Sequence, residues 1–180
     1  YIYDNKDYLI TGEFPRQVFY QLRDLLDSNN GYENWCNLVR ENEWIIPVLQ
    51  TKDVSGVAIQ YQSLCSFNRG VVIRFSLQDL ESGKYEDVLS ELPHDNDGDI
   101  LVVIDLGRIG TRVVEYSNVV VRYIKSVLIK LPGCSVSITG SSFPDSFGER
   151  ESGSSTIYER MLYAKVSQQL DCPLIYSDYG

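Results

Sequence analysis

Residues 99–108, with the sequence DILVVIDLGR, contain the most regular hydrophobic run in the chain. Residues 100–104 are all apolar, and four of these five are β-branched. A strand without a polar face is typical of a central parallel strand that is covered on both faces. Asp105 ends the run, and Gly107 gives the chain a place to turn. Because ligands bind at the carboxyl ends of parallel strands in α/β folds, Asp105 is the first candidate site residue.

Four more apolar segments have the pattern of strands, at residues 44–50, 71–77, 134–139 and 174–176. Pro47 removes one ladder donor from the first of these segments, so we expect an edge strand or a bulge there. The strands follow one another at intervals on the order of 30 residues, which suits right-handed βαβ crossovers. The pattern therefore predicts an α/β fold with five parallel strands that alternate with helices.

Helices are predicted between these strands by apolar stripes with start and stop signals at their ends. Asp53 is placed to cap one helix, and Thr156 forms a capping box with Glu159 for the last one. Asn- and Gly-containing segments at 29–31 and 68–70 are the stop signals. The predicted helices begin at Pro15, near Trp35, at Asp53, at Lys84, at Thr111 and at Thr156.

The strand and helix pattern fits two architectures, a partial TIM-barrel-like fold and an open doubly wound sheet. The chain begins with Tyr1 and ends directly after an apolar run, so we expect a segment of a longer protein and favour the partial barrel. With 180 residues and 43% apolar composition, the chain is long enough for one domain. We expect a helical lead-in at 1–43, from a truncated upstream βα unit, and a five-stranded barrel-like segment at 44–180.

Charge and cysteine usage limit the function classes. The net charge of −9 argues against direct non-specific binding to nucleic acid or to an anionic membrane. No apolar run approaches the roughly 18 residues of a membrane span. The cysteines lie far apart without a CxxC spacing, and His94 is the single histidine, so we expect buried thiols, a cytoplasmic location and no metal site. The sequence identifies no cofactor.

The candidate site consists of polar residues near the predicted carboxyl ends of the strands. Arg74 stands inside the apolar segment VVIRF, where a buried guanidinium needs an acidic partner, and Asp105 is the natural one. In one interpretation Arg74 binds a phosphate or a carboxylate, and an aspartate acts as general base or metal ligand. In the other, Arg74 and Asp105 form a purely structural pair. The residues expected on this rim are Gln50, Arg74, Asp105, Ser141, Ser142 and Asp178.

Ser141 and Ser142 do not form a serine-hydrolase site. They stand in GSSFP, which differs from the GxSxG pattern, and His94 is expected at the opposite rim of the sheet. The segment 140–155 is interpreted as a mobile rim loop. Its backbone amides could hold an anion, but plain disorder of the segment is the favoured interpretation.

Four short motifs together resemble the Beta protein family, which is described from T-even bacteriophages and from bacterial genomes. They are VVIDLG at 102–107, ITGSSFP at 138–144, the pair Glu159-Arg160, and YSDYG at 176–180. The resemblance extends from about Trp44 to the end and corresponds to the later part of a family member, without the family's first strands. It implies a TIM-barrel-like α/β domain of unassigned biochemical activity.

Two functions remain as hypotheses. The first is a ligand- or protein-binding module in phage–host conflict, which uses its barrel mouth and a surface rich in tyrosines, 13 in all, to engage a partner, a ligand or a second copy. The second is a TIM-barrel hydrolase or lyase that acts on an anionic substrate, with Arg74 as clamp and Asp105 and Asp178 as acid–base or metal groups. A weaker third option is a structural fragment whose sheet edges a neighbouring chain covers.

Overall fold

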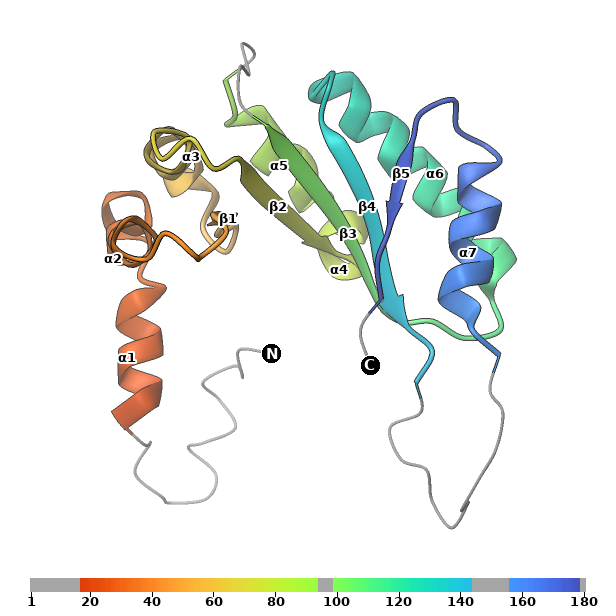
Figure 1. The fold of residues 1–180 in the computed structure, drawn as a ribbon, viewed down its shortest axis with the longest axis horizontal. Coiled ribbons are helices and arrows are strands. Elements are labelled where there is room, and N and C mark those ends of the chain that lie inside the picture. The colour runs from red at the N-terminus through yellow and green to blue at the C-terminus, as the bar shows by residue number, and fades with distance from the viewer. Residues whose placement is uncertain (1–16, 94–98, 144–155, 179–180) are drawn as a thin grey trace.

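The computed structural model describes residues 17–93, 99–143 and 156–178 (Figure 1). The helices in these ranges are α1 (Gln17–Leu25), α2 (Asn29–Glu41), the 3-10 helix η2 (Val54–Gly56), α3 (Val57–Cys65), α4 (Leu77–Glu81), α5 (Lys84–Ser90), α6 (Val113–Lys130) and α7 (Tyr158–Ser167). The strands are β1 (Val48–Leu49), β2 (Val71–Ser76), β3 (Ile100–Arg108), β4 (Ser135–Ser141) and β5 (Leu174–Tyr176).

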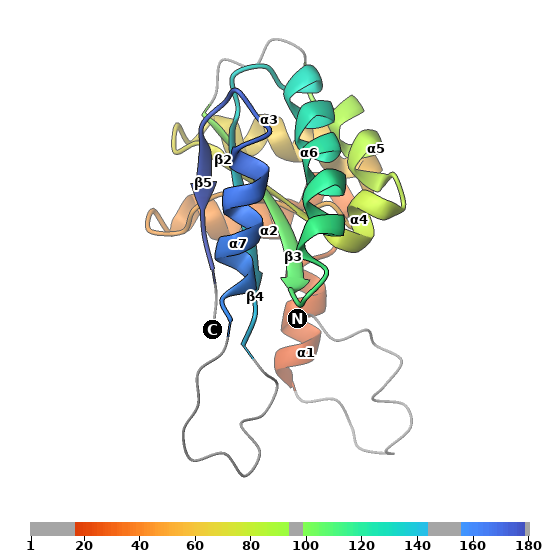
Figure 2. The ribbon, with the colours of Figure 1, turned by 90° about the vertical axis from the view of Figure 1, so that its right-hand side faces the viewer.

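The five strands form one sheet in the order β1-β2-β3-β4-β5, and all neighbouring pairs are parallel. This confirms the predicted α/β fold. In the described part of the chain the sheet is open, with β1 and β5 at its edges, and it does not close into a barrel. Right-handed crossovers that run in one direction along a sheet place their helices on the same side. Figure 2 shows this arrangement, with α4, α5 and α6 on one side of the strands.

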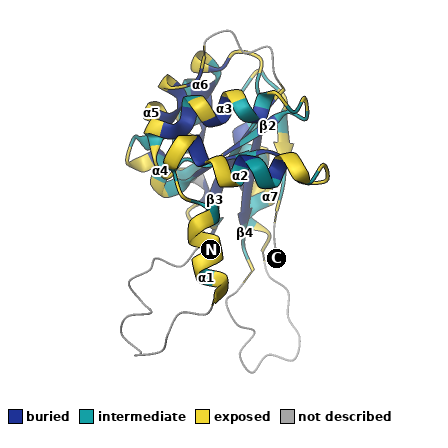
Figure 3. Cartoon of the chain, turned by 90° about the vertical axis from the view of Figure 1, so that its left-hand side faces the viewer, coloured by how far each residue is buried: buried dark blue, intermediate teal, exposed yellow. Residues whose placement is uncertain are grey.

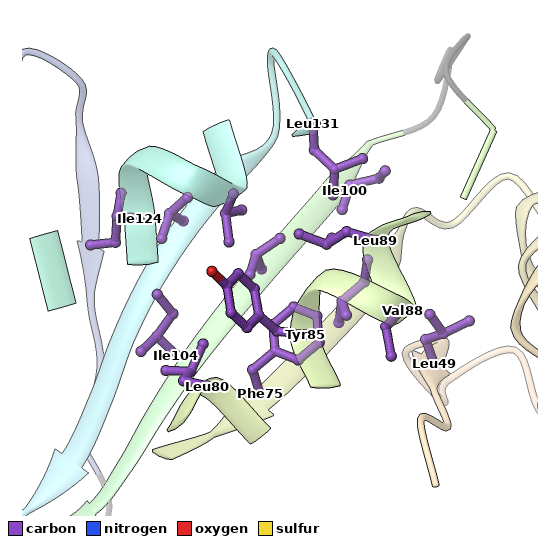
Figure 4. Packing of buried hydrophobic residues seen from close by; sticks show 14 of the residues in the cluster. Leu49, Phe75, Leu80, Tyr85, Val88, Leu89, Ile100, Ile104, Ile124 and Leu131 are labelled. Atoms are coloured by element: carbon purple, nitrogen blue, oxygen red, sulfur yellow. The ribbon is translucent and has the colours of Figure 1, made fainter. Parts of the chain in front are cut away.

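The hydrophobic core lies between the sheet and these helices. Ile73, Phe75 and Ile104 point from the strands to the helix side and are fully buried. Figure 4 shows Phe75 and Ile104 gathered with Tyr85 of α5 and Ile124 of α6. The rings of Phe75 and Tyr85 meet edge to face, with 6.2 Å between their centroids. This side of the sheet is called the helix face below.

The other side of the sheet, called the open face below, is not covered by any described helix. Val72, Leu101 and Val103 point to this side and are only half-buried. The expectation that the run 100–104 is covered on both faces is therefore wrong for the described residues. An apolar run cannot reveal which of its two alternating faces the helices cover, because both faces have the same composition.

The junction between α3 and β2 shows why the sequence folds as it does here. The chain leaves the helix through Asn68 and Gly70, which both have left-handed backbone conformations, with φ of 53° and 70°. A Cβ atom on Gly70 would lie 3.0 Å from the backbone oxygen of Asp99. Glycine therefore permits both the turn and the close approach of β3.

Several predicted boundaries differ in the structure. The predicted strand at 44–50 contains only two paired residues, although it does form an edge, as Pro47 indicated. The capping box of Thr156 with Glu159 is wrong, because α7 is capped at Ile157 without a side-chain hydrogen bond. Helix α4 was not predicted, since it spans just five residues. The expectations for Pro15, His94 and most of the loop 140–155 lie outside the described residues.

Helix α2 packs into the same core as the strands, although it belongs to the predicted lead-in. Cys36 and Val39 of α2 are buried in the cluster that includes residues of β2 and β3. Figure 3 shows buried positions on α2, whereas α1 has no buried residue. The predicted boundary between residues 43 and 44 stays a prediction.

Candidate functional site

The open face carries polar side chains on three neighbouring strands. The register pairs Arg74 of β2 with Val103 of β3, and Val103 with Ser137 of β4. Asp105 of β3 is paired with Thr139 of β4 in the same way. Because side chains alternate between the two sides of a strand, the residues of both rows point away from the helices. The open face therefore brings an arginine, an aspartate and hydroxyl groups together towards the carboxyl ends of the strands.

Arg74 and Asp105 form the centre of this arrangement. Nε of Arg74 donates a hydrogen bond to Oδ2 of Asp105 at 2.8 Å, and Nη2 donates to the same oxygen at 2.5 Å. Oδ1 of Asp105 accepts a hydrogen bond from the backbone N–H of Gly107 at 2.8 Å. Gly107 has a φ of +62°, a conformation that suits glycine and that turns its N–H back towards the carboxylate. The pairing of Arg74 with Asp105 that the sequence indicated is present.

The two partners differ in exposure. The side chain of Asp105 is 6% exposed, whereas that of Arg74 is 59% exposed. The expectation that the guanidinium is buried in the interior is therefore wrong for the described structure. A carboxylate that is buried and hydrogen-bonded on both oxygens fixes the orientation of an arginine whose side chain remains open to solvent.

A row of hydroxyl groups on β4 borders this pair, and its residues are not among those predicted from the sequence. Ser137 and Thr139 are buried polar residues. Oγ of Ser137 lies 2.9 Å from Oγ of Ser177, which follows β5. The signal was present in the segment CSVSIT, where serine and threonine alternate with apolar residues. Such alternation is typical of a strand with one polar face.

Two of the other predicted residues at the strand ends, Gln50 and Ser141, take part in local hydrogen bonds. The backbone N–H of Gln50, just after β1, donates to Oε1 of the fully buried Gln60 at 2.6 Å. Oγ of Ser141, the last residue of β4, accepts a hydrogen bond from the backbone N–H of Phe143 at 3.1 Å. Ser142 is half-buried beside it. These residues lie near the carboxyl ends of the strands, as predicted, and their roles in binding stay predictions.

The structure does not bring Asp178 to Asp105. Oδ2 of Asp178 accepts a hydrogen bond from the Tyr176 hydroxyl at 2.7 Å. The Tyr176 ring in turn packs edge to face against Tyr163 of α7, at 5.4 Å between centroids. Burial, together with the carboxylate of Asp178, raises the pKa of Tyr176 to about 12. Asp178 therefore lies on the side of β5 that faces α7, whereas Asp105 lies on the open face.

Neither a metal-binding cluster nor a membrane-spanning helix is present in the described ranges. Within residues 17–93, 99–143 and 156–178, no three or more His, Cys, Asp or Glu side chains are grouped in a way that could hold a metal ion. In the same ranges, none of the helices has the length and apolar character needed to cross a bilayer.

Comparison with known proteins relates the chain to a family. The family described as Beta protein matches residues 4–180, which is nearly the whole chain. The chain belongs to the Beta protein family. Its relative "Protein beta" of Enterobacteria phage P4 is 27% identical over 165 residues, which are 87% of this chain and 45% of that protein. The chain therefore spans less than half the length of this relative.

The comparison supports a phage connection for this Beta family domain, whereas it does not support a T-even source. No solved structure gives a significant match to the chain. The TIM-barrel-like architecture that the family resemblance implied is not confirmed, since the described strands form an open sheet.

Proposed function

We propose that this Beta family domain is a binding module whose open face binds an anionic group, a carboxylate or a phosphate, through Arg74. One observation carries the proposal. Arg74 is held by two hydrogen bonds to a buried carboxylate while more than half of its side chain remains exposed. A guanidinium has five N–H donors in a planar fork, and those that do not bond Asp105 suit the oxygens of a planar or tetrahedral anion.

The surroundings of Arg74 support binding at this position. The side chain stands on a strand that is paired on both sides, so its base is rigid. Ser137 and Thr139 lie on the two adjacent rows of the same face as buried polar residues, so Arg74 is the exposed polar group of these rows. The half-buried Val72 and Val103 add apolar surface that an organic ligand or a protein partner would cover.

The biological setting that we propose is phage–host conflict in the cytoplasm of an infected cell. The relative in phage P4 supports this setting. The anionic group would then belong to a small ligand or to a side chain of a protein partner, including a second copy of the domain. The net charge of −9 favours a partner that presents a local anionic group over one that is anionic as a whole.

The alternative function, a hydrolase or lyase with an anionic substrate, receives less support. General acid–base catalysis of the kind expected from the sequence needs a second titratable group beside Asp105. Asp178 was the residue proposed for this role, and it is hydrogen-bonded to Tyr176 on the side of α7. Binding through Arg74 needs only the groups that the open face brings together.

Anion titrations of the purified chain test the proposal. Inorganic phosphate and citrate are added at constant ionic strength, and binding is followed by calorimetry and by the melting temperature. We expect Arg74→Gln to abolish the rise in melting temperature and Arg74→Lys to weaken it, since lysine keeps the charge but loses the planar fork. The matched control is Arg122→Gln, which removes an exposed arginine from α6 on the helix side. Equal responses of the wild type and Arg74→Gln would refute the proposal.

A further inference from the structure

We propose that Cys134 and Cys172 form a site of reversible oxidation, at which a disulfide ties the edge strand β5 to β4. The parallel register pairs Val136 of β4 with Leu174 of β5. Cys134 and Cys172 each stand two residues before this pair, just ahead of the first residues of β4 and β5. Neighbouring strands lie about 4.8 Å apart, and the Cα atoms of disulfide-bonded cysteines are about 4.4–6.8 Å apart. The spacing of the two backbones is therefore compatible with a disulfide.

The environment of the two thiols supports this pairing. Both cysteines are free and half-buried, and Cys134 packs against the hydrophobic core. Burial, and in addition the charge of the neighbouring Cys172, raises the pKa of Cys134 to about 11. Each sulfur thus lies within the electrostatic reach of the other. The other two cysteines, Cys36 on α2 and Cys65 on α3, lie on elements that pack near β1, at the opposite edge of the sheet.

The reaction needs a low-molecular-weight disulfide, such as oxidised glutathione, as oxidant. Because Cys134 holds its proton at neutral pH, Cys172 makes the first attack and forms a mixed disulfide, which releases one glutathione thiol. The Cys134 thiolate then attacks the Cys172 sulfur and expels the second glutathione thiol. In total, two protein thiols lose two protons and two electrons, and the S–S bond of the oxidant is reduced. The second step accelerates as the pH rises, since it needs the Cys134 thiolate.

The disulfide would act on a short edge strand of the sheet. Strand β5 spans three residues and pairs on one side only, with β4. A covalent link at its start closes a loop that contains all of α7 and restricts the unfolded chain. It would also limit the movement of β5 relative to β4, which share the hydrogen bond between Ser137 and Ser177 on the open face.

Peptide mapping tests the pairing directly. The purified full chain is incubated with oxidised glutathione at pH 8.5, alkylated, and digested with trypsin without reduction. Each cysteine lies on its own predicted tryptic peptide, and those of Cys134 and Cys172 are residues 131–150 and 166–180. We expect one dominant cross-linked product of these two peptides, and a melting temperature that falls when the disulfide is reduced.

Variants separate this pair from general thiol oxidation. Cys134→Ser is expected to leave Cys172 as a stable mixed disulfide with glutathione. The matched control Cys65→Ser is expected to form the cross-link as the wild type does. The proposal is overturned if the wild type yields only glutathione adducts at Cys134 and Cys172, or if the main cross-link joins another pair of cysteines.

Discussion

The two faces of the central sheet differ in both sequence and surroundings, because the helix face is apolar and the open face carries polar groups among its apolar residues. On the helix face, Ile73 and Phe75 of β2 are fully buried under helices. On the open face, the intervening Val72 is half-buried and Arg74 is exposed. Burial on one face supplies most of the free energy that holds the sheet together, since that free energy scales with the apolar area removed from water. The open face is therefore the part of the sheet where polar groups can be held without loss of the core.

This difference also explains how the Arg74–Asp105 ion pair can stabilise the sheet while its guanidinium remains accessible to a ligand. The carboxylate of Asp105 is buried between strands and is satisfied by Arg74 and by Gly107. The guanidinium lies on the solvent side of the pair. A salt bridge of this kind differs from one that is buried on both sides, in which neither group could meet a ligand.

The largest loss of stability is expected from a substitution that creates a cavity on the helix face. Phe75→Ala should reduce the free energy of unfolding by about 3–5 kcal/mol, because the ring is fully buried and packs against Tyr85. Val103→Ala, on the open face of the adjacent strand, should cost no more than about 1 kcal/mol, since its side chain is half-buried. Urea unfolding of both variants gives the comparison. Similar losses at the two positions would show that the open face is packed as tightly as the helix face.

The next largest losses of stability are expected from the ion pair, and they should differ between its two partners. Arg74→Gln leaves a buried carboxylate without its cation and should cost about 1–2 kcal/mol. Asp105→Asn should cost less, about 1 kcal/mol or below, because water can solvate the exposed guanidinium and the amide oxygen can still accept the N–H of Gly107. Chemical denaturation of both single variants and of the double variant measures this asymmetry and the coupling. A larger loss for Asp105→Asn would contradict the assigned exposures.

A smaller change in the free energy of unfolding is expected at the end of β2, where the chain passes from the strand into α4. Ser76 caps α4 in a capping box with Asp79, and Nζ of Lys84 lies 3.2 Å from Asp79 Oδ1. Burial raises the pKa of Asp79, but the hydrogen bonds from Ser76 and the charge of Lys84 outweigh this and hold it below the usual 3.8. Ser76→Ala should cost about 1 kcal/mol.

The pH dependence of this cap follows from the lowered pKa. A carboxyl group with a lower pKa in the folded state stabilises the fold fully above the unfolded pKa, and this contribution is lost as the pH falls through the folded value. The difference in unfolding free energy between the wild type and Asp79→Asn should therefore be constant from pH 7 to about 5 and should shrink below about pH 4. Urea unfolding across this range checks it, with the exposed Glu81→Gln on the same helix as the control. If the difference between the wild type and Asp79→Asn grew towards low pH, the ionised Asp79 carboxylate would not be what stabilises the cap.

The sequence predicted the parts of the fold that depend on local signals. The apolar runs located the strands, and Asn68 and Gly70 marked the end of α3. The pairing of Arg74 with Asp105 was predictable because an arginine in an apolar strand needs an acidic neighbour.

Other features depend on tertiary geometry and could not be read from the sequence. The position of Asp178 is one example, because the side of β5 that it occupies depends on contacts of Tyr176 with α7. The exposure of Arg74 is another, since it depends on which face of the sheet the helices cover. The short length of strand β1 is a third example, because the backbone N–H of Gln50, directly after it, donates to the side chain of Gln60 on α3.

The most direct test of the open face as the binding surface is an NMR titration of the labelled chain with inorganic phosphate, at constant ionic strength. We expect the largest shifts at the Arg74 Nε–H and at the backbone amides around Gly107 and Thr139, and no shifts on α6. Shifts that are largest on α6, or an Arg74 Nε–H signal that does not move at saturating phosphate, would contradict it.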